Sequence, residues 1–260
     1  MIWGEKPEVR ATPPTPPDPS PGSIFKLIGE DIAAVRANDP AARGWIEILT
    51  SYPGLHAIWL HRIAHAMWNG GSLTRARMLS NVNRAITGIE IHPGATLGRR
   101  VFIDHGMGVV IGETAVVGDE CLIYKGVVLG GTSLERAKRH PTLGAGVVVG
   151  SNACILGRVT IGDGAMIGSG SVVIRDVPAG ATSVGVPGRI VSTVDPSHGP
   201  LDHGDLPDPF ATVLRDLVAQ IDGLKGRLEA LEGGEKGPTD GEAAMGEEIA
   251  AVFFEDFGDG

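Results

Sequence analysis

The chain has 260 residues, a formal net charge of −9, 39 glycines and only 5% aromatic residues. The negative charge disfavours general nucleic-acid binding, no run approaches the roughly 18 apolar residues of a membrane span, and the first residues lack the apolar segment of a signal peptide. The two cysteines, Cys121 and Cys154, stand in no paired metal-ligand spacing, which favours a reduced cytoplasm.

The first 88 residues divide into two segments. Residues 1–22 are rich in proline and cannot build a core, so they are predicted to be disordered. Residues 23–88 have apolar residues at helical spacing, with a first helix ending at Pro40, a second after Pro53-Gly54 and a third over about 73–86. His61 and His65 lie four residues apart on the second, but no Glu completes a metalloprotease pattern, so we interpret both as structural.

A six-residue period occupies residues 89–191. Its inward aliphatic positions are Ile91, Leu97, Ile103, Ile111, Val117, Ile123, Leu129, Leu143, Val149, Ile155, Ile161, Ile167 and Val173. A small or slim residue follows most of them by four positions, with Met107 as the large exception. This pattern is typical of a parallel β-helix, in which each six residues form a short strand and a turn. It places Cys121 in the core and Cys154 on the outside.

The C-terminal part changes character again. Residues 192–208 are predicted to be a linker, and residues 233–260 a flexible acidic tail. Between them, over 209–232, apolar residues from Phe210 to Leu231 alternate spacings of four and three, which indicates a coiled coil. The alternative is an amphipathic helix docked on the body, since Gly223 and Gly226 each weaken a helix by about 1 kcal/mol. The predicted class is thus α+β: an N-terminal helical region, a left-handed parallel β-helix, then a C-terminal helix and flexible tail.

Function is expected where the repeat is interrupted, because the regular coils of a β-helix offer few polar groups. The first interruption contains Asp104 and His105, and the second, GGTSLERAKRHPTLG, contains Arg139 and His140. We expect this loop to bring its histidine over a substrate beside His105. A neutral imidazole is a suitable general base near pH 7 for a hydroxyl nucleophile.

A carboxylate that is hydrogen-bonded to the second ring nitrogen would fix the tautomer of such a base. Glu90 lies 15 residues before His105, slightly less than one coil, so both are expected on one side of the barrel. A zinc site of the β-helix carbonic-anhydrase type would need a third histidine soon after His140, and none follows before His198. No metal is therefore predicted.

Three stretches resemble one family: GIEIHPGATLGRRVFIDHGMGVVIGETAVVGD, GVVLGGTSLERAKRHPTLGAGVVVG and IGSGSVVIRDVPAGATSVGVPGRIV are similar to serine O-acetyltransferases of the hexapeptide-repeat acyltransferases. The resemblance covers about residues 28–191. Its DHG…GET and KRHP elements are specific within these acyltransferases, whereas the hexads alone are not. It implies that acetyl-CoA and L-serine react to give O-acetylserine and CoA, for cysteine synthesis.

The resemblance also implies residue roles. His105 matches the general base and Glu90 its paired carboxylate, where the family often has Asp. Arg139 and His140 match residues that hold the substrate carboxylate; Asp39 and Asp104 match the acids that receive the amino group, and Glu113 matches a supporting acid. Asp39 also fits a plain helix-ending Asp-Pro turn.

Partners follow from the same resemblance. CoA is expected along a groove between neighbouring barrels, held by Gly131, Gly150, Ser151, Gly168, Ser169 and Arg189. A shared groove implies a homotrimer, and a helical region much shorter than that of the long enteric form favours a trimer over a hexamer. The acidic tail ends Gly258-Asp259-Gly260, without the Ile by which the family anchors to O-acetylserine sulfhydrylase, so binding of that enzyme is a weaker expectation.

Two other functions fit the same sequence. One is an acetyl-CoA-dependent enzyme acting on a sugar, an antibiotic or homoserine. The other is a non-catalytic β-helix scaffold. Arg139 together with two amine-binding acids favours an amino acid over a neutral sugar, and the two histidines at the interruptions argue against a scaffold.

Overall fold

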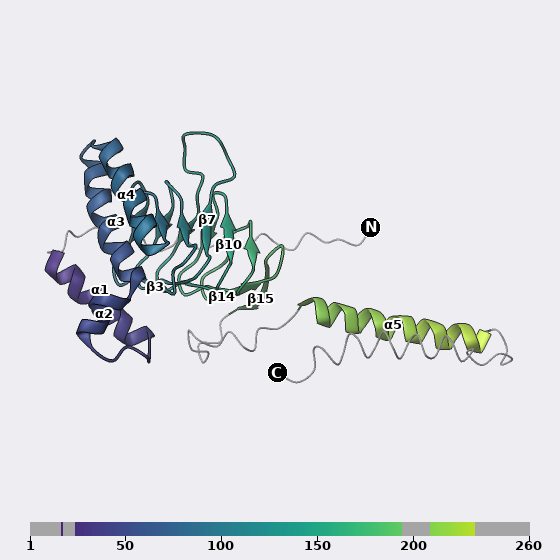
Figure 1. Cartoon of the computed structure of the whole chain (residues 1–260). Helices are drawn as coiled ribbons and strands as arrows, with labels where there is room; N and C mark the ends of the chain where they lie inside the picture. Colours follow the sequence, from purple (N-terminus) through teal and green to yellow (C-terminus); the bar gives the residue numbers. More distant parts are fainter. Residues whose placement is uncertain (1–16, 18–23, 194–208, 232–260) are drawn as a thin grey trace. The chain divides into compact units, whose positions relative to one another are not determined.

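The computed structural model describes residues 17, 24–193 and 209–231 (Figure 1). The predicted Pro-rich segment, linker and acidic tail lie outside these residues except at residues 17 and 192–193. The chain forms two compact units, residues 1–203 and 204–260, which are treated separately below. Across the residues that the structure covers, no helix has the length and apolarity needed to span a membrane.

Four helices precede the β-structure: α1 (Ile24–Asn38), α2 (Trp45–Ser51), α3 (Pro53–Asn69) and α4 (Leu73–Thr87). Pro53 occupies the first turn of α3, where its missing N–H costs nothing. Gly88 ends α4 in the left-handed conformation, with φ of 73°, which a glycine adopts without strain. The short helix α2 was not predicted, because its seven residues are too few to show a helical period.

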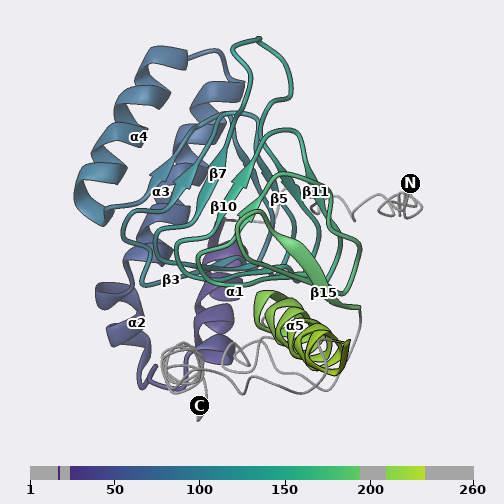
Figure 2. The same ribbon diagram turned by 90° about the vertical axis from the view of Figure 1, so that its right-hand side faces the viewer.

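The strands form three sheets that the chain visits in turn (Figure 2). Sheet A contains β1 (Glu90–Ile91), β4 (Val110–Ile111), β7 (Val128–Gly130), β10 (Cys154–Leu156) and β13 (Val172–Val173). Sheet B contains β2 (Thr96–Leu97), β5 (Val116–Val117), β8 (Thr142–Leu143) and β11 (Thr160–Ile161). Sheet C contains β3 (Phe102–Asp104), β6 (Leu122–Tyr124), β9 (Val148–Val149), β12 (Met166–Ile167), β14 (Ala181–Val184) and the antiparallel β15 (Arg189–Thr193). The predicted helices followed by a parallel β-helix are confirmed.

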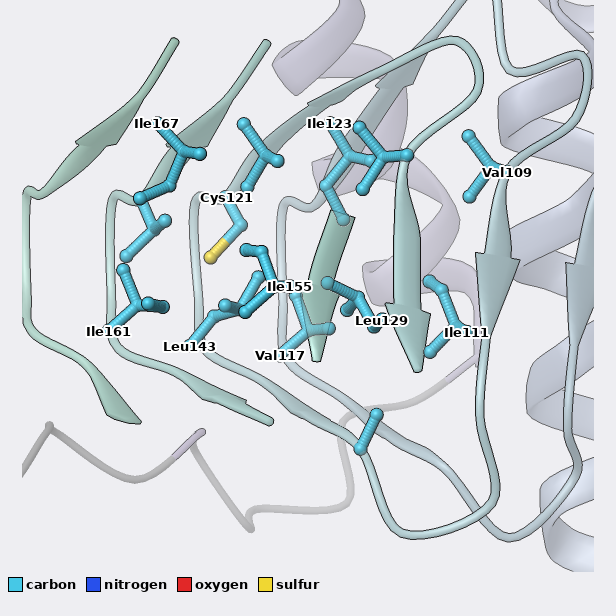
Figure 3. Packing of buried hydrophobic residues seen from close by; sticks show 14 of the residues in the cluster. Val109, Ile111, Val117, Cys121, Ile123, Leu129, Leu143, Ile155, Ile161 and Ile167 are labelled. Carbon is cyan, nitrogen blue, oxygen red and sulfur yellow. The ribbon is translucent and has the colours of Figure 1, made fainter. Parts of the chain in front are cut away.

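The interior of the β-helix is a column of stacked aliphatic side chains (Figure 3). All predicted inward positions are buried except Leu97, which is partly buried against the same cluster. Cys121 lies in this column and Cys154 outside it, as predicted. Met107 is 68% exposed, and Val109, two residues later, fills the core instead. The two-residue slip in the repeat thus moves a bulky side chain out of the barrel.

The outer faces of the three sheets differ in what covers them. On sheet C, Phe102, Leu122 and Val148 pack under Val35, Ile48 and Leu55 of the helices. On sheet B the outward positions include Thr96, Thr142 and Thr160, which suit contact with water. Sheet A presents an apolar, half-buried row at its outward positions: Val110, Val128, Cys154 and Val172. A face of this kind favours contact with another protein surface.

Replacing Gly54 with Ala is expected to lower the melting temperature by several degrees. Gly54 brings α3 against β3, and a Cβ there would overlap the carbonyl oxygen of Ile103. Overpacking of this kind costs about 1–3 kcal/mol of the free energy of unfolding. Gly29→Ala in α1 is the matched control, because nothing lies within 4 Å of its Cβ position. Equal melting temperatures for the two variants in a thermal scan would contradict the close approach.

Candidate active site

The predicted catalytic residues lie at two different corners of the triangular barrel. The C/A corner consists of the turns that lead from sheet C to sheet A, and the first of these, after β3, contains His105. The A/B corner consists of the turns from sheet A to sheet B, and it contains Glu113 after β4. The loop carrying Arg139 and His140 joins β7 to β8, so it belongs to the A/B corner as well (Figure 1).

At the C/A corner, His105 faces outward. Its backbone has φ of 51°, its side chain is 79% exposed, and its Nε2 atom lies 3.9 Å from Oδ1 of Asp104. Burial raises the pKa of the Asp104 carboxyl. His105 acts in the opposite direction and lowers this pKa, whereas the negative charge of nearby Asp39 raises it further. Two acids and an imidazole therefore share this corner, and the acids come from different elements: Asp104 from β3 and Asp39 from the end of α1.

The Asp39 carboxylate is held on both oxygens. Its Oδ1 accepts a hydrogen bond from the backbone N–H of Ala41 at 2.7 Å, and its Oδ2 accepts one from the Tyr52 hydroxyl at 2.6 Å. Burial, with the Asp39 hydrogen bond, raises the pKa of Tyr52 to about 12, so the phenol keeps its proton and remains the donor. Asp39 is thus both the predicted Asp-Pro turn residue and a fixed charge beside Asp104.

Glu90 lies at the start of β1, one coil below His105 at the same corner. Its carboxylate faces the guanidinium of Arg84 in α4, with Oε2 and Nη1 3.3 Å apart. Pairing with His105 would exchange this partner for the imidazole. The Glu90–His105 pair therefore stays a prediction.

The loop at the A/B corner is anchored by the side chain of Thr114 and by that of Lys138. Oγ1 of Thr114 accepts the backbone N–H groups of Arg139 at 3.0 Å and His140 at 3.1 Å. Lys138 adds two bonds from Nζ, to the carbonyls of Thr114 at 2.6 Å and Pro141 at 3.1 Å, and its burial lowers its pKa to about 8. The polar loop that interrupts the repeat is therefore tied back to the coil beneath it.

Hydrogen bonds also orient the charged and polar side chains at the A/B corner. The Arg139 guanidinium bonds the Glu113 carboxylate and holds the pKa of that carboxyl below its usual range. His140 is buried, and burial together with Arg139 lowers its pKa. Its Nδ1 accepts the backbone N–H of Thr114 at 3.2 Å, so the proton of the neutral ring is on Nε2. The corner offers a guanidinium and an imidazole N–H donor.

Comparison with known proteins decides the family. Residues 140–175 match the bacterial transferase hexapeptide model of six repeats. A serine acetyltransferase of Bacillus subtilis is 51% identical over 79% of this chain and 95% of its own length. The chain belongs to the serine acetyltransferase family. Two solved structures of the family share its fold: the Neisseria gonorrhoeae serine acetyltransferase with serine (44% identity, 65% of this chain and 69% of that one, TM-score 0.63) and a serine acetyltransferase with CoA (42%, 65% and 70%, TM-score 0.62).

We expected the loop that contains His140 to lie beside His105. Within one chain of this serine acetyltransferase family member it does not. His105 stands at the C/A corner, whereas Arg139 and His140 stand at the A/B corner, because one interruption follows a sheet C strand and the other a sheet A strand. The residues predicted to bind CoA divide in the same way. Gly150, Ser151, Gly168 and Ser169 lie on successive turns of the C/A corner, Gly131 lies at the A/B corner, and Arg189 begins β15.

Three residues of the two corners were not predicted: Tyr52, Thr114 and Arg84. Thr114 follows Glu113 in the GET element, which was a usable signal. Tyr52 and Arg84 belong to the helical region. The helical spacing of apolar residues there does not predict which barrel residue each of them contacts. His61, predicted to be structural, is buried in α3, and burial lowers its pKa to about 3. Within the described part of the chain, no three His, Cys, Asp or Glu side chains are grouped to hold a metal.

Proposed function

We propose that this chain transfers the acetyl group of acetyl-CoA to the hydroxyl of L-serine, giving O-acetylserine and CoA. The observation that carries the proposal is the distribution of charge between the corners. Asp39 and Asp104 offer negative charge beside an exposed imidazole, and Arg139 offers a guanidinium beside an imidazole N–H. A zwitterionic amino acid with a hydroxyl needs these groups. The family structures that contain serine and CoA support the substrates.

The proton transfer is assigned to His105. The imidazole removes the proton of the serine hydroxyl, and the oxygen attacks the thioester carbonyl. The tetrahedral intermediate collapses by breaking the carbon–sulfur bond, and the imidazolium returns the proton to the thiolate of CoA. Asp104 lies beside this ring, with its Oδ1 3.9 Å from Nε2. Glu90 would orient the ring after leaving Arg84.

The remaining residues are assigned to binding. Asp39 and Asp104 take the ammonium, and Arg139 with the Nε2–H of His140 takes the carboxylate. Glu113 keeps the guanidinium in place through their hydrogen bond. The backbone at Gly131, Gly150, Ser151, Gly168 and Ser169, with Arg189, is assigned to CoA.

These assignments require two copies at each site, since the groups of one chain lie at different corners. Three copies around a threefold axis, with sheet A facing the axis, place the C/A corner of each against the A/B corner of the next. The apolar outer row of sheet A, including Val128 and Cys154, supports this arrangement. Contact with O-acetylserine sulfhydrylase stays a prediction, because it was assigned to residues 233–260, outside those described.

The activity is tested by following CoA thiol release with a panel of acceptors. The expected acceptor is L-serine, and N-acetylserine, which lacks the ammonium charge, should be a far poorer one. Homoserine, a neutral sugar and an aminoglycoside represent the competing functions. Turnover of the sugar or the aminoglycoside without turnover of serine would overturn the proposal.

Tyr52→Phe is expected to raise KM for serine several-fold with little change in kcat. The variant removes the 2.6 Å hydrogen bond to Asp39, so the carboxylate loses its fixed position toward the ammonium. A double-mutant cycle with Asp39→Asn separates this role from packing. Once Asp39 is Asn, the effect of Tyr52→Phe on KM should largely vanish. Additive effects on KM would show that the tyrosine does not act through Asp39.

A further inference from the structure

Helix α5 (Pro209–Leu231) forms the described part of the second unit. Every side chain described within it, from Leu217 to Leu228, is exposed. These include large apolar groups: Leu217 (48%), Val218 (45%), Ile221 (51%), Leu224 (61%) and Leu228 (56%). In proteins, most helical stability comes from packing an apolar face rather than from intrinsic helix propensity. The helix therefore needs a partner surface.

The apolar residues in the sequence of α5 form a regular seam. In heptad register, a positions are Leu214, Ile221 and Leu228, and d positions are Leu217, Leu224 and Leu231. Charged residues within the helix occupy only b, c, e and g: Arg215, Asp216, Asp222, Lys225, Arg227 and Glu229. Gly223 and Gly226 fall at c and f, and nothing lies within 4 Å of their Cβ positions. The glycines lower helix propensity without interrupting the seam.

We propose that α5 forms a parallel three-stranded coiled coil with the α5 helices of two other copies of this chain. An unbroken a/d seam with Val218 at an e position is self-complementary, since identical copies present the same stripe to one another. The number of strands rests on the proposed trimer of the barrels. Each α5 is joined at its N-terminal end, through residues 194–208, to a body that meets two others. This shared attachment gives the helices one direction and a high effective concentration.

The consequence concerns the shared site. Each site needs the C/A corner of one copy and the A/B corner of another, so an enzyme that dissociates on dilution loses turnover. The proposed coiled coil joins the copies through α5, which supplies none of the residues assigned to the reaction. Its contribution should therefore appear at low enzyme concentration and not in kcat at high concentration.

The test compares Ile221→Asp/Leu224→Asp, on the seam, with Ala219→Asp/Gly226→Asp, at two f positions. Mass photometry gives the oligomer at nanomolar concentration, and thiol release gives the specific activity from nanomolar to tens of micromolar. We expect the seam variant to lose trimers and about tenfold or more of its specific activity at nanomolar concentration, and to keep wild-type kcat when concentrated. The f-position variant should match wild type throughout.

Two results would overturn the proposal. In the first, the seam variant and the f-position control are equally trimeric and equally active at nanomolar concentration. That result would mean that α5 docks elsewhere or binds another protein. The second concerns the parallel orientation of the α5 helices. In a Cys154→Ser background, the variant Leu228→Cys should form disulfide-linked pairs between copies under mild oxidation. A parallel coiled coil places the same residue of each copy opposite its equivalents. Failure to cross-link would exclude the parallel register. If wild type itself were monomeric and active, both the shared site and the coiled coil would fail, whereas a trimeric wild type with an unaffected seam variant would refute the coiled coil alone.

Discussion

Replacing His105 with Ala is expected to lower kcat/KM for serine by about 10²–10⁴-fold, the usual contribution of a positioned general base. The side chain is 79% exposed and contributes nothing to the core, so the fold and the oligomer should be retained. Thiol release with saturating acetyl-CoA measures the loss, and a thermal scan with mass photometry shows that the variant is folded and assembled.

The matched control is Glu120→Ala. Glu120 also has a left-handed backbone, with φ of 60° against 51° for His105, but it lies in a turn from sheet B to sheet C, away from both corners of the site. Its ion pair with Arg100 is exposed, so its loss should cost little. Near-normal turnover in His105→Ala, or an equal loss in Glu120→Ala, would remove the general-base assignment.

The six-residue period predicted the barrel because burial in a β-helix is a local property of each hexad. An aliphatic residue and a small one four positions later point inward whatever the rest of the chain does. The exception is instructive: the period placed Met107 at an inward position, and the chain instead inserts Val109 after a two-residue slip. Where a turn can lengthen, the period does not say which residue resumes the column.

The placement of site residues was harder to predict, because it depends on which corner a turn occupies. Both interruptions contain a histidine, and the sequence alone suggested that the two histidines meet over one substrate. His105 follows a strand of sheet C, and the loop with His140 follows a strand of sheet A, so the three-sheet winding separates them. Helical contacts were equally hidden: nothing in the sequence indicates that Glu90 faces Arg84 or that Tyr52 donates to Asp39.

The division of the site between corners leads to a prediction for mixed oligomers. His105→Ala damages only the C/A corner, and Arg139→Ala damages only the A/B corner and should lower kcat/KM by about 30-fold or more through loss of a charge-assisted bond. If the proposed trimer is assembled from both variants, some of its sites combine the intact C/A corner of one copy with the intact A/B corner of the next. A trimer that contains both variants has one intact site of its three, whichever variant is in excess, so purified mixed trimers should show about a third of the wild-type activity.

Co-expression of the two variants with different tags, followed by two affinity steps, isolates the mixed trimers for the thiol assay. The control pairs His105→Ala with Asp104→Asn. Both changes lie at the C/A corner, so every copy has a damaged C/A corner and no site in the mixed trimer can be intact. Recovery in the first pair and none in the second would place the reacting groups on two chains. Mixed trimers that regain nothing in either pair would mean that His105 and Arg139 do not serve one shared site, and the assignment of the A/B corner to the substrate carboxylate would fall with it.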